Sequence, residues 1–459
     1  FEKRPGSHQT SRRIIIIDHF HSLHHSLIHS FSLSRPNHTT IQFNSIQFIM
    51  SASISKNIFI VGAKRTPFGA FGGSFKALSA TDLGVTATKA ALQEANLLDP
   101  ETVVDHVYFG NVIPSSKDAA YLARHVGLKS GLSQETPALT INRLCGSGFE
   151  TVVQGANSIR LGDADVVVCG GTENMSMAPL QVNGKDARWG VGLGKGLHLG
   201  DALWDGLTDA YAKTPMGVTA ENLAKQYNIT REECDEYAIR SQQLWQKAHE
   251  AGVFEAELAP VEIKTRKGGS KLVSVDEHPR PDSTLESLAK LKPVFDGVVT
   301  AANASGICDG AGTVILASEE AVSKHNLKPL ARLVSYGITG CDPTIMGIGP
   351  VQAIQQALQK APGNLNLHTD VDRIEINEAF AAQTLACMKE LELSDDKTNI
   401  HGGAISLGHP LGASGSRITA HLVQDLANNK EESNNKKKIH VGAACIGGGQ
   451  GIAIVLESV

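Results

Sequence analysis

The chain has 459 residues, of which 41% are hydrophobic, enough for a large buried core and more than one ordinary domain needs. Its formal net charge of −5 provides no basic field that would attract DNA or RNA, so nucleic-acid binding is not expected. No apolar run reaches the roughly 18 to 20 residues that a membrane-spanning helix needs, because Gly, Asp or Lys interrupts the longest runs.

The seven cysteines are an odd number, without a CxxC pair or zinc-finger spacing. This pattern predicts free thiols in a reducing compartment rather than a disulfide framework. Five of them lack a turn motif or activating polar neighbours, so we expect them to pack in the core. These five are Cys169, Cys234, Cys308, Cys341 and Cys387. The histidines also lack ligand spacing, so no metal site is expected.

The first 49 residues differ from the rest, because they are rich in His and Ser, almost free of acidic residues, and start with Phe1. One interpretation is translated upstream sequence or a disordered leader, with Met50 as the natural start. The alternative is an organelle transit peptide, since such peptides are basic, Ser-rich and poor in acids. We exclude this segment from the expected fold.

From Lys56 onward, β-branched runs alternate with glycine turns and amphipathic stretches, which is typical of an α/β protein. The predicted strands of the first part are residues 57–63, 103–109, 138–143 and 165–169, and its predicted helices are 80–96 and 149–161. Gly170 and Gly171 are expected to end the last of these strands.

The C-terminal third repeats this order, which indicates two similar halves. Its predicted strands are residues 373–376, 440–444 and 451–456, with helices after residues 377–380 and over 416–427. Between the halves lies a less regular section, roughly residues 175–300, with a charged helix around 230–251 and a basic run at 264–271. We expect this section to be an inserted loop domain.

Three reactive side chains stand at glycine-rich turns next to predicted strands or helices: Cys145, His409 and Cys445. Unpaired N–H groups and the macrodipole at a helix start favour a thiolate, and Cys145 fits that description. A cysteine beside glycine is more often structural than catalytic, so the turns alone do not decide the function.

Six motifs, taken together, resemble those of the thiolase family. They occur in the family's order and cover essentially all of residues 56–459. They are residues 142–148 (NRLCGSG), 170–175 (GGTENM), 303–306 (NASG), 377–380 (NEAF), 408–412 (GHPLG) and 445–449 (CIGGG).

The resemblance implies the thiolase fold, an α/β fold of two βαβαβαββ halves in a layered α/β/α/β/α arrangement with an inserted loop domain. The expected units are residues 1–55 as the leader, 56–175 as the first part of the N-terminal half, 176–300 as a CoA-binding loop domain, 301–325 as the return to the N-terminal half and 326–459 as the C-terminal half.

The resemblance also implies an acyltransferase that splits 3-ketoacyl-CoA with coenzyme A into acetyl-CoA and a shortened acyl-CoA. Cys145 resembles the nucleophile, His409 the base that takes its proton, and Cys445 the acid/base that protonates the departing carbanion. An imidazole with a pKa near 6.5 suits the base, and a thiol near pKa ~8.5 is mostly protonated at pH 7. One oxyanion hole is implied at the amides of Cys145 and Gly447, and another at His409 with a water held by Asn377.

Coenzyme A is a substrate of this family, and no further cofactor is implied. Ser305 in the NASG motif resembles the pantetheine contact, and Arg266 stands where the family places a residue against the nucleotide. Met216 is expected in the CoA-binding set. It follows Pro215, where the biosynthetic branch of the family typically has a histidine facing the acyl pocket. The smaller, apolar Pro215 favours a degradative enzyme of β-oxidation with room for longer acyl chains.

Three alternatives remain beside a degradative thiolase. A biosynthetic acetoacetyl-CoA thiolase would use the same residues. Ketoacyl synthases, which are more distant, lack the second cysteine, so Cys445 argues against them. A non-catalytic lipid-binding protein on the same fold would be expected to lose Cys145, His409 or Cys445, and this chain has all three.

The resemblance implies a homodimer or homotetramer. Residues 182–200 stand where tetrameric members carry an assembly loop, but this loop does not decide between the two. The motifs most resemble the mitochondrial branch, whose amino end is an uncleaved signal, so the expected compartment is the mitochondrial matrix. The cytosol and the peroxisome are the alternatives, although residues 457–459 (ESV) are not a peroxisomal address of the Ser-Lys-Leu type.

Overall fold

The structure is a computed structural model that describes residues 56–265, 268–428 and 437–459. Within these ranges the main sheet has the strand order β14-β15-β16-β13-β1-β12-β5-β3-β4, and β2 also pairs with β12. Its N-terminal strands are β1 (Ile58–Arg65), β3 (His106–Gly110), β4 (Ala138–Ile141), β5 (Val166–Asn174) and β12 (Cys308–Ser318). Its C-terminal strands are β13 (Ala331–Gly340), β14 (Arg373–Ile376), β15 (Ile439–Ile446) and β16 (Gln450–Glu457).

The two halves of the sheet follow the same pairing pattern. In the N-terminal half β3 runs parallel to β4 and β5, and β12 runs antiparallel to β5 and β1. In the C-terminal half β14 runs parallel to β15, and β16 runs antiparallel to β15 and β13. A short antiparallel ladder from Ile58 to Ile60 of β1 joins the halves through β13. The predicted pair of similar halves is therefore confirmed.

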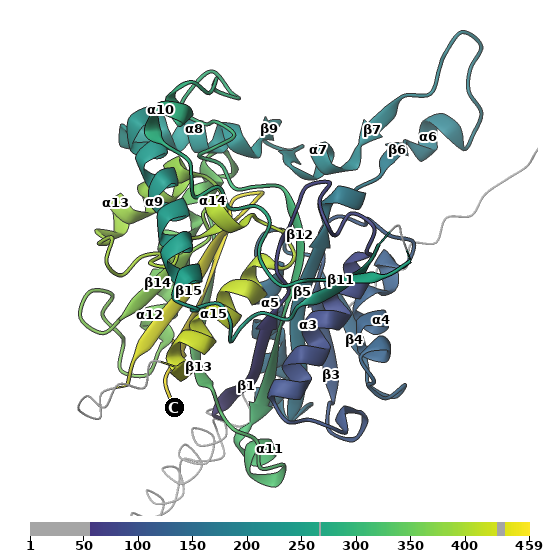
Figure 1. Cartoon of the computed structure of the whole chain (residues 1–459), viewed down its shortest axis with the longest axis vertical. Coiled ribbons are helices and arrows are strands. Elements are labelled where there is room, and N and C mark those ends of the chain that lie inside the picture. Colours follow the sequence, from purple (N-terminus) through teal and green to yellow (C-terminus); the bar gives the residue numbers. More distant parts are fainter. Residues whose placement is uncertain (1–55, 266–267, 429–436) are drawn as a thin grey trace, which may run out of the picture. The chain divides into compact units, whose positions relative to one another are not determined.

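Helices cover both outer faces of these half-sheets and fill the space between them (Figure 1). Helices α3 (Ala80–Glu94) and α4 (Leu122–Lys129) pack on the outer face of the N-terminal half, and α12 (Gly349–Lys360) packs on that of the C-terminal half. Helices α5 (Ser147–Leu161) and α15 (Ser414–Asn428) form the middle layer, in a core shared with strands of both halves. The predicted α/β/α/β/α layering is confirmed.

The two middle helices meet at glycines near their N-termini. A Cβ on Gly148 of α5 would lie 2.4 Å from the backbone N of Ser416, and one on Gly415 of α15 would lie 2.2 Å from the backbone N of Phe149. Real side chains do not tolerate such distances, so glycine on both sides permits this approach. The consequence is that the turns preceding the two helices, which carry Cys145 and His409, are brought together.

The section between the halves contains α8 (Met216–Tyr227), α9 (Arg231–Glu250) and α10 (Leu285–Ala289), together with the hairpin of β10 (Val261–Lys264) and β11 (Ser270–Val273). Thr230 and Glu233 form a capping box that starts α9. A fully buried Arg65 on β1 binds Glu257 at 2.5 Å and Asp276 at 2.7 Å, which ties this section to the sheet. A second hairpin, β6 (Leu180–Val182) and β7 (Leu199–Asp201) with α6 (Gly184–Ala187), extends away from the body (Figure 1).

The remaining elements are short or flank the site. They are β2 (Gly69–Ala70), β8 (Thr208–Asp209), β9 (Thr214–Pro215), α7 (Ala202–Gly206), α11 (Glu319–Lys324), α13 (Ala381–Leu391), α14 (Ala404–Leu407), η1 (Pro100–Thr102), η2 (Ala119–Tyr121), η3 (Met175–Met177) and η4 (Pro343–Ile348). In the part of the chain that the structure describes, no helix has both the length and the apolar character to cross a membrane.

Most element predictions agree with the structure to within a few residues, but one strand end is wrong. The strand predicted to stop before Gly170 and Gly171 continues as β5 to Asn174. These glycines do not break the strand, because they make room for neighbours on both faces. A Cβ on Gly170 would lie 2.3 Å from the ring of Phe109, and one on Gly171 would lie 1.8 Å from the carbonyl O of Gly412.

Candidate active site

Cys145 lies in a tight turn between β4 and α5. The turn is held by its own side chains, because Oδ1 of Asn142 accepts from the Leu144 amide at 2.9 Å, and Oγ of Ser147 accepts from the Arg143 amide at 2.9 Å. Leu144 has φ +46°, a left-handed conformation that is costly for a residue with a branched side chain. The strained residue stands directly before the cysteine, a placement common at functional sites.

The thiol of Cys145 contacts the turn that follows Cys445. Burial raises the pKa of Cys145 to about 11, while hydrogen bonds from the amide of Gly447 and from its own amide oppose this shift. The expectation that the helix start would favour a thiolate is therefore wrong for the resting chain. Removal from water outweighs the partial charge of the α5 N-terminus, so the free thiol needs a base.

His409 is buried in the turn that precedes α15. Its Nδ1 lies 2.5 Å from Oγ of Ser414, and its backbone N donates to the carbonyl O of Gly306 at 2.9 Å. Burial, followed by the positive charge of Arg417, lowers the pKa of His409 to about 3. The expected pKa near 6.5 is therefore wrong, because the imidazole is removed from bulk water and, within the described part of the chain, has no carboxylate partner to stabilise its charged form. It is a neutral ring at physiological pH.

Asn377 follows β14 and faces the same imidazole. Its Nδ2 lies 3.3 Å from Nε2 and 3.4 Å from Nδ1 of His409, and its backbone N donates to the carbonyl O of Ala443 at 2.9 Å. Its Oδ1 is buried and has no hydrogen-bond partner among the residues that the structure describes. A buried amide oxygen of this kind is available to accept from a water or a ligand group.

Cys445 is the penultimate residue of β15 and is fully buried. It packs with Met346 and Ala379, two residues that line the cavity described below. Burial raises the pKa of Cys445 well above its usual value, and the neighbouring Cys145 raises it further. Cys445 is therefore a protonated thiol at neutral pH, as the sequence led us to expect.

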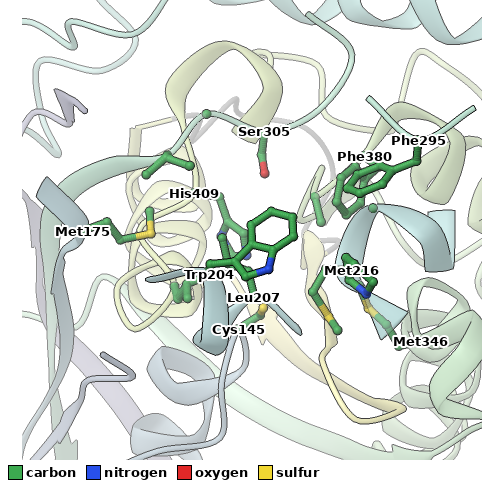
Figure 2. Close-up of a pocket in the computed structure, with 16 residues that line it drawn as sticks. Cys145, Met175, Trp204, Leu207, Met216, Phe295, Ser305, Met346, Phe380 and His409 are labelled. Carbon is green, nitrogen blue, oxygen red and sulfur yellow. The ribbon is translucent and has the colours of Figure 1, made fainter. Parts of the chain in front are cut away.

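A cavity of about 180 Å³ brings these turns together with the inserted section. Cys145, His409 and Ser305 line it, and they come from parts of the chain more than a hundred residues apart (Figure 2). The rest of the lining is mainly apolar and aromatic: Met175, Trp204, Leu207, Pro215, Met216, Phe295, Met346, Phe380 and Leu411 are the larger side chains. Such a cavity suits an apolar chain that ends in one reactive polar group.

Two further cavities adjoin residues of this set. One of about 280 Å³ is also lined by Cys145 and Met216, and it reaches Gly447. Met216 lies beside Gly447, since a Cβ on Gly447 would lie 3.2 Å from its sulfur. Another cavity, of about 260 Å³, is lined by Arg280, Ala301 and Ala302, shortly before Ser305 in the chain. Arg266 lies outside the described residues.

Glu173 belongs to the motif of residues 170–175, but the sequence did not reveal its part in the site. Its carboxylate accepts from the amides of Val112, Ile113 and Gly412 and from Nδ2 of Asn111, at 2.9 to 3.1 Å. Burial raises the pKa of Glu173 to about 7 against the effect of these donors. Because Gly412 belongs to the turn of His409, Glu173 ties this turn to the N-terminal half.

Comparison with known proteins agrees with this arrangement. The model of the thiolase N-terminal domain matches residues 58–320, and that of the thiolase C-terminal domain matches residues 327–458. The chain belongs to the thiolase family. Human mitochondrial 3-ketoacyl-CoA thiolase is 57% identical over 408 residues, which cover 88% of this chain and 99% of the relative. A probable acetyl-CoA acyltransferase of Staphylococcus aureus is 43% identical over 402 residues, covering 87% of this chain and 98% of the relative.

Solved thiolase structures share the fold. A crystal structure of human mitochondrial 3-ketoacyl-CoA thiolase in complex with CoA has a TM-score of 0.83 and 56% identity, covering 88% of this chain and 98% of that one. The crystal structure of the acetyl-CoA acetyltransferase of Bacillus anthracis has a TM-score of 0.83 and 42% identity, covering 89% of this chain and 100% of that one. The names 3-ketoacyl-CoA thiolase and acetyl-CoA acetyltransferase therefore both occur among the relatives of this thiolase.

Proposed function

We propose that the chain is a degradative 3-ketoacyl-CoA thiolase, which cleaves 3-ketoacyl-CoA with coenzyme A in fatty acid β-oxidation. The observation that carries this proposal is that Cys145, His409 and Ser305 line one cavity, with the amide of Gly447 bonded to the Cys145 thiol. A nucleophile, a base and an amide donor at one point are what acyl transfer requires.

In the first half-reaction Cys145 attacks the C3 ketone while its proton passes to Nε2 of the neutral His409. The charge that forms on the carbonyl oxygen is stabilised by nearby donors; one such donor is typically worth about 10²–10³ in rate. The bond between C2 and C3 then breaks, which leaves the shortened acyl group on Cys145 and acetyl-CoA as a carbanion. Cys445 protonates that carbanion, so acetyl-CoA leaves and Cys445 becomes the thiolate.

In the second half-reaction the Cys445 thiolate takes the proton of coenzyme A, whose sulfur attacks the thioester on Cys145. Cys145 then leaves and regains its proton from His409, which restores both thiols. The high pKa of each buried cysteine supports this scheme, because each must hold a proton at one stage. The unpaired Oδ1 of Asn377 supports a water bound there as a donor to the second oxyanion.

Coenzyme A enters this scheme as a substrate, and we propose that its pantetheine lies in the cavity along Ser305 and Met216. The neighbouring cavity with Arg280, an exposed guanidinium, is suited to the nucleotide phosphates. Arg266 remains a prediction for the same contact. The region of residues 176–300, which carries Arg280 and Met216, is accordingly proposed as the CoA-binding loop domain between residues 56–175 and the segments 301–325 and 326–459.

The proposal is tested by intact-mass measurement after incubation with acetyl-CoA. We expect the wild-type chain to gain one acetyl group, and Cys145→Ala to gain none and to lose thiolysis of acetoacetyl-CoA. No adduct on the wild-type chain would refute the enzymatic proposal. An undiminished adduct on Cys145→Ala would refute the assignment of the nucleophile.

The second candidate is a biosynthetic acetoacetyl-CoA thiolase. The likeness to the acetyl-CoA acetyltransferase of Bacillus anthracis favours it, and the same residues would run the reaction in the direction of condensation. Pro215, which lines the cavity, supports the degradative assignment because it leaves space for a longer acyl chain. Kinetics over a range of chain lengths distinguish the two candidates.

We further propose a homodimer or homotetramer in the mitochondrial matrix. The extended hairpin around α6 exposes Trp189 by 82% and Leu193 by 107%, and β4 leaves one edge of the main sheet unpaired within the described residues. Apolar side chains and a free strand edge of this kind favour subunit contacts. The names of the mammalian relatives support the mitochondrion, with the cytosol or the peroxisome as alternatives. Light scattering and a fluorescent fusion test these two points.

A further inference from the structure

Ser414 makes the shortest hydrogen bond to the imidazole of His409. It is the first residue of α15, it is 1% exposed, and its Oγ lies 2.5 Å from Nδ1. The same Oγ lies 3.1 Å from the carbonyl O of Pro410. None of the proposed chemical steps uses Ser414, yet it is placed against the proposed base.

The two contacts of the Ser414 hydroxyl, with Nδ1 and with the Pro410 carbonyl, favour one form of the neutral ring. A hydroxyl has one proton to donate and lone pairs to accept with, whereas the Pro410 carbonyl can only accept. When the hydroxyl donates to Pro410, its lone pair faces Nδ1 and can accept a proton held there. Nδ1 then carries the hydrogen, and Nε2 has the free lone pair.

Asn377 does not distinguish the two forms of the ring. Its Nδ2 lies 3.3 Å from Nε2 and 3.4 Å from Nδ1, and an amide NH₂ group can donate to whichever nitrogen carries the lone pair. The position of the proton is therefore argued from Ser414 alone.

We infer that Ser414 is a positioning residue that holds His409 with its proton on Nδ1, so that Nε2 is presented as the base for Cys145. This inference rests on the proposed function and deepens it. The Cys145 proton moves to Nε2, and the bond from Nδ1 to Ser414 persists in the resulting imidazolium. When Cys145 leaves the thioester, Nε2 returns the proton, so Ser414 gains and loses nothing.

The role of Ser414 differs from that of a carboxylate partner. A carboxylate would stabilise the charged ring and raise its pKa, whereas a neutral hydroxyl orients the ring without adding a charge. This agrees with a buried histidine that stays neutral until it takes the proton of Cys145. Orientation matters for such a base, since the wrong tautomer presents a hydrogen where a lone pair is required.

The test compares Ser414→Ala with a matched control, Ser416→Ala. Ser416 lies on the same helix, is equally buried, and donates to the Ala413 carbonyl at 2.9 Å, but among the described residues its side chain makes no hydrogen bond to the imidazole. We expect the single-turnover rate of acylation by acetyl-CoA to fall at least tenfold in Ser414→Ala relative to the control. A tenfold loss of rate is smaller than the full 10²–10⁴-fold acceleration that general base catalysis typically contributes. The Kd for coenzyme A should change less than twofold in both variants.

Equal acylation rates in the two variants would overturn the inference while leaving the proposed function intact. Failure of the wild-type chain to acylate would instead overturn the proposed function. The position of the proton can also be measured in the unaltered wild-type protein, by ¹⁵N NMR of labelled histidine. The His409 signal is assigned by its absence from the spectrum of His409→Gln. We expect the proton on Nδ1, and a spectrum with the proton on Nε2 would overturn the inference even if Ser414→Ala failed to fold.

Discussion

Gly171→Ala tests how closely the turn of His409 depends on the neighbouring strand. Gly171 lies in β5, and an added Cβ would stand 1.8 Å from the carbonyl O of Gly412, three residues after His409. Ordinary van der Waals contact begins at 3.4 Å, so the turn or the strand must move by about 3.4 − 1.8 = 1.6 Å. The atom in the way is a backbone oxygen, so no flexible side chain can move aside. Hydrogen bonds to Glu173 and Ser414 also hold the same turn in place.

A misplacement of about 1 Å in a catalytic group can cost roughly 10²-fold in rate. We therefore expect kcat/KM for thiolysis of acetoacetyl-CoA to fall at least about 10²-fold, equivalent to about 2.7 kcal/mol of transition-state stabilisation. The matched control is Gly340→Ala in β13, where the nearest atom to an added Cβ is 3.9 Å away. A Gly171→Ala enzyme within threefold of this control would refute the argument that the glycine positions the His409 turn.

Three more predictions follow from the site. Cys445→Ser should keep acylation of Cys145 but stop deuterium exchange at the acetyl α-carbon, because a hydroxyl is a far weaker acid than a thiol; deuterium wash-in to acetyl-CoA measures this. With Pro215 lining the cavity, kcat/KM should rise from acetoacetyl-CoA to 3-ketooctanoyl-CoA, by up to about 0.8 kcal/mol or roughly fourfold per methylene, in steady-state kinetics. Because His409 has a pKa of about 3, it is already a neutral base at pH 5.5, and the buried thiols stay protonated up to pH ~9, so acylation should be nearly constant between these pH values in Glu173→Gln, which removes the carboxyl whose pKa is about 7.

Each of these predictions has a contrary result. Normal deuterium exchange in Cys445→Ser would move the acid/base role elsewhere, with His409 as the first candidate. A steady fall in kcat/KM with chain length would replace the degradative assignment by the biosynthetic one. An acid limb with a midpoint near pH 6.5 in Glu173→Gln, measured where the fold is intact by circular dichroism, would mean that His409 titrates like an exposed histidine.

Much of the fold was predictable because local patterns and glycine turns carry it. The alternation of strands and helices predicted both halves, and the order of six motifs predicted the family. Where local pattern misled, a contact distant in sequence was responsible. β5 continues through Gly170 and Gly171 because Phe109 and Gly412 occupy the space that side chains would need.

The candidate site, like the fold, could be predicted from the sequence only in part. The sequence by itself determined which side chains are chemically able to act, since Cys145, His409 and Cys445 each stand at a recognisable turn. It could not determine their protonation, because burial depends on the layers packed above each residue. That burial holds His409 neutral and both cysteines protonated, against the expectation from a helix start for Cys145.

Only the tertiary structure decided which residues support these three. Glu173 and Gly412 are 239 positions apart, and no local pattern predicts that the carboxylate of one binds the amide of the other. Ser414 follows the motif of residues 408–412, but its bond to Nδ1 depends on how the turn folds at the start of α15. The physical reason is that hydrogen-bond partners and desolvation are set by packing between the two halves, while the sequence specifies directly only the groups that pack.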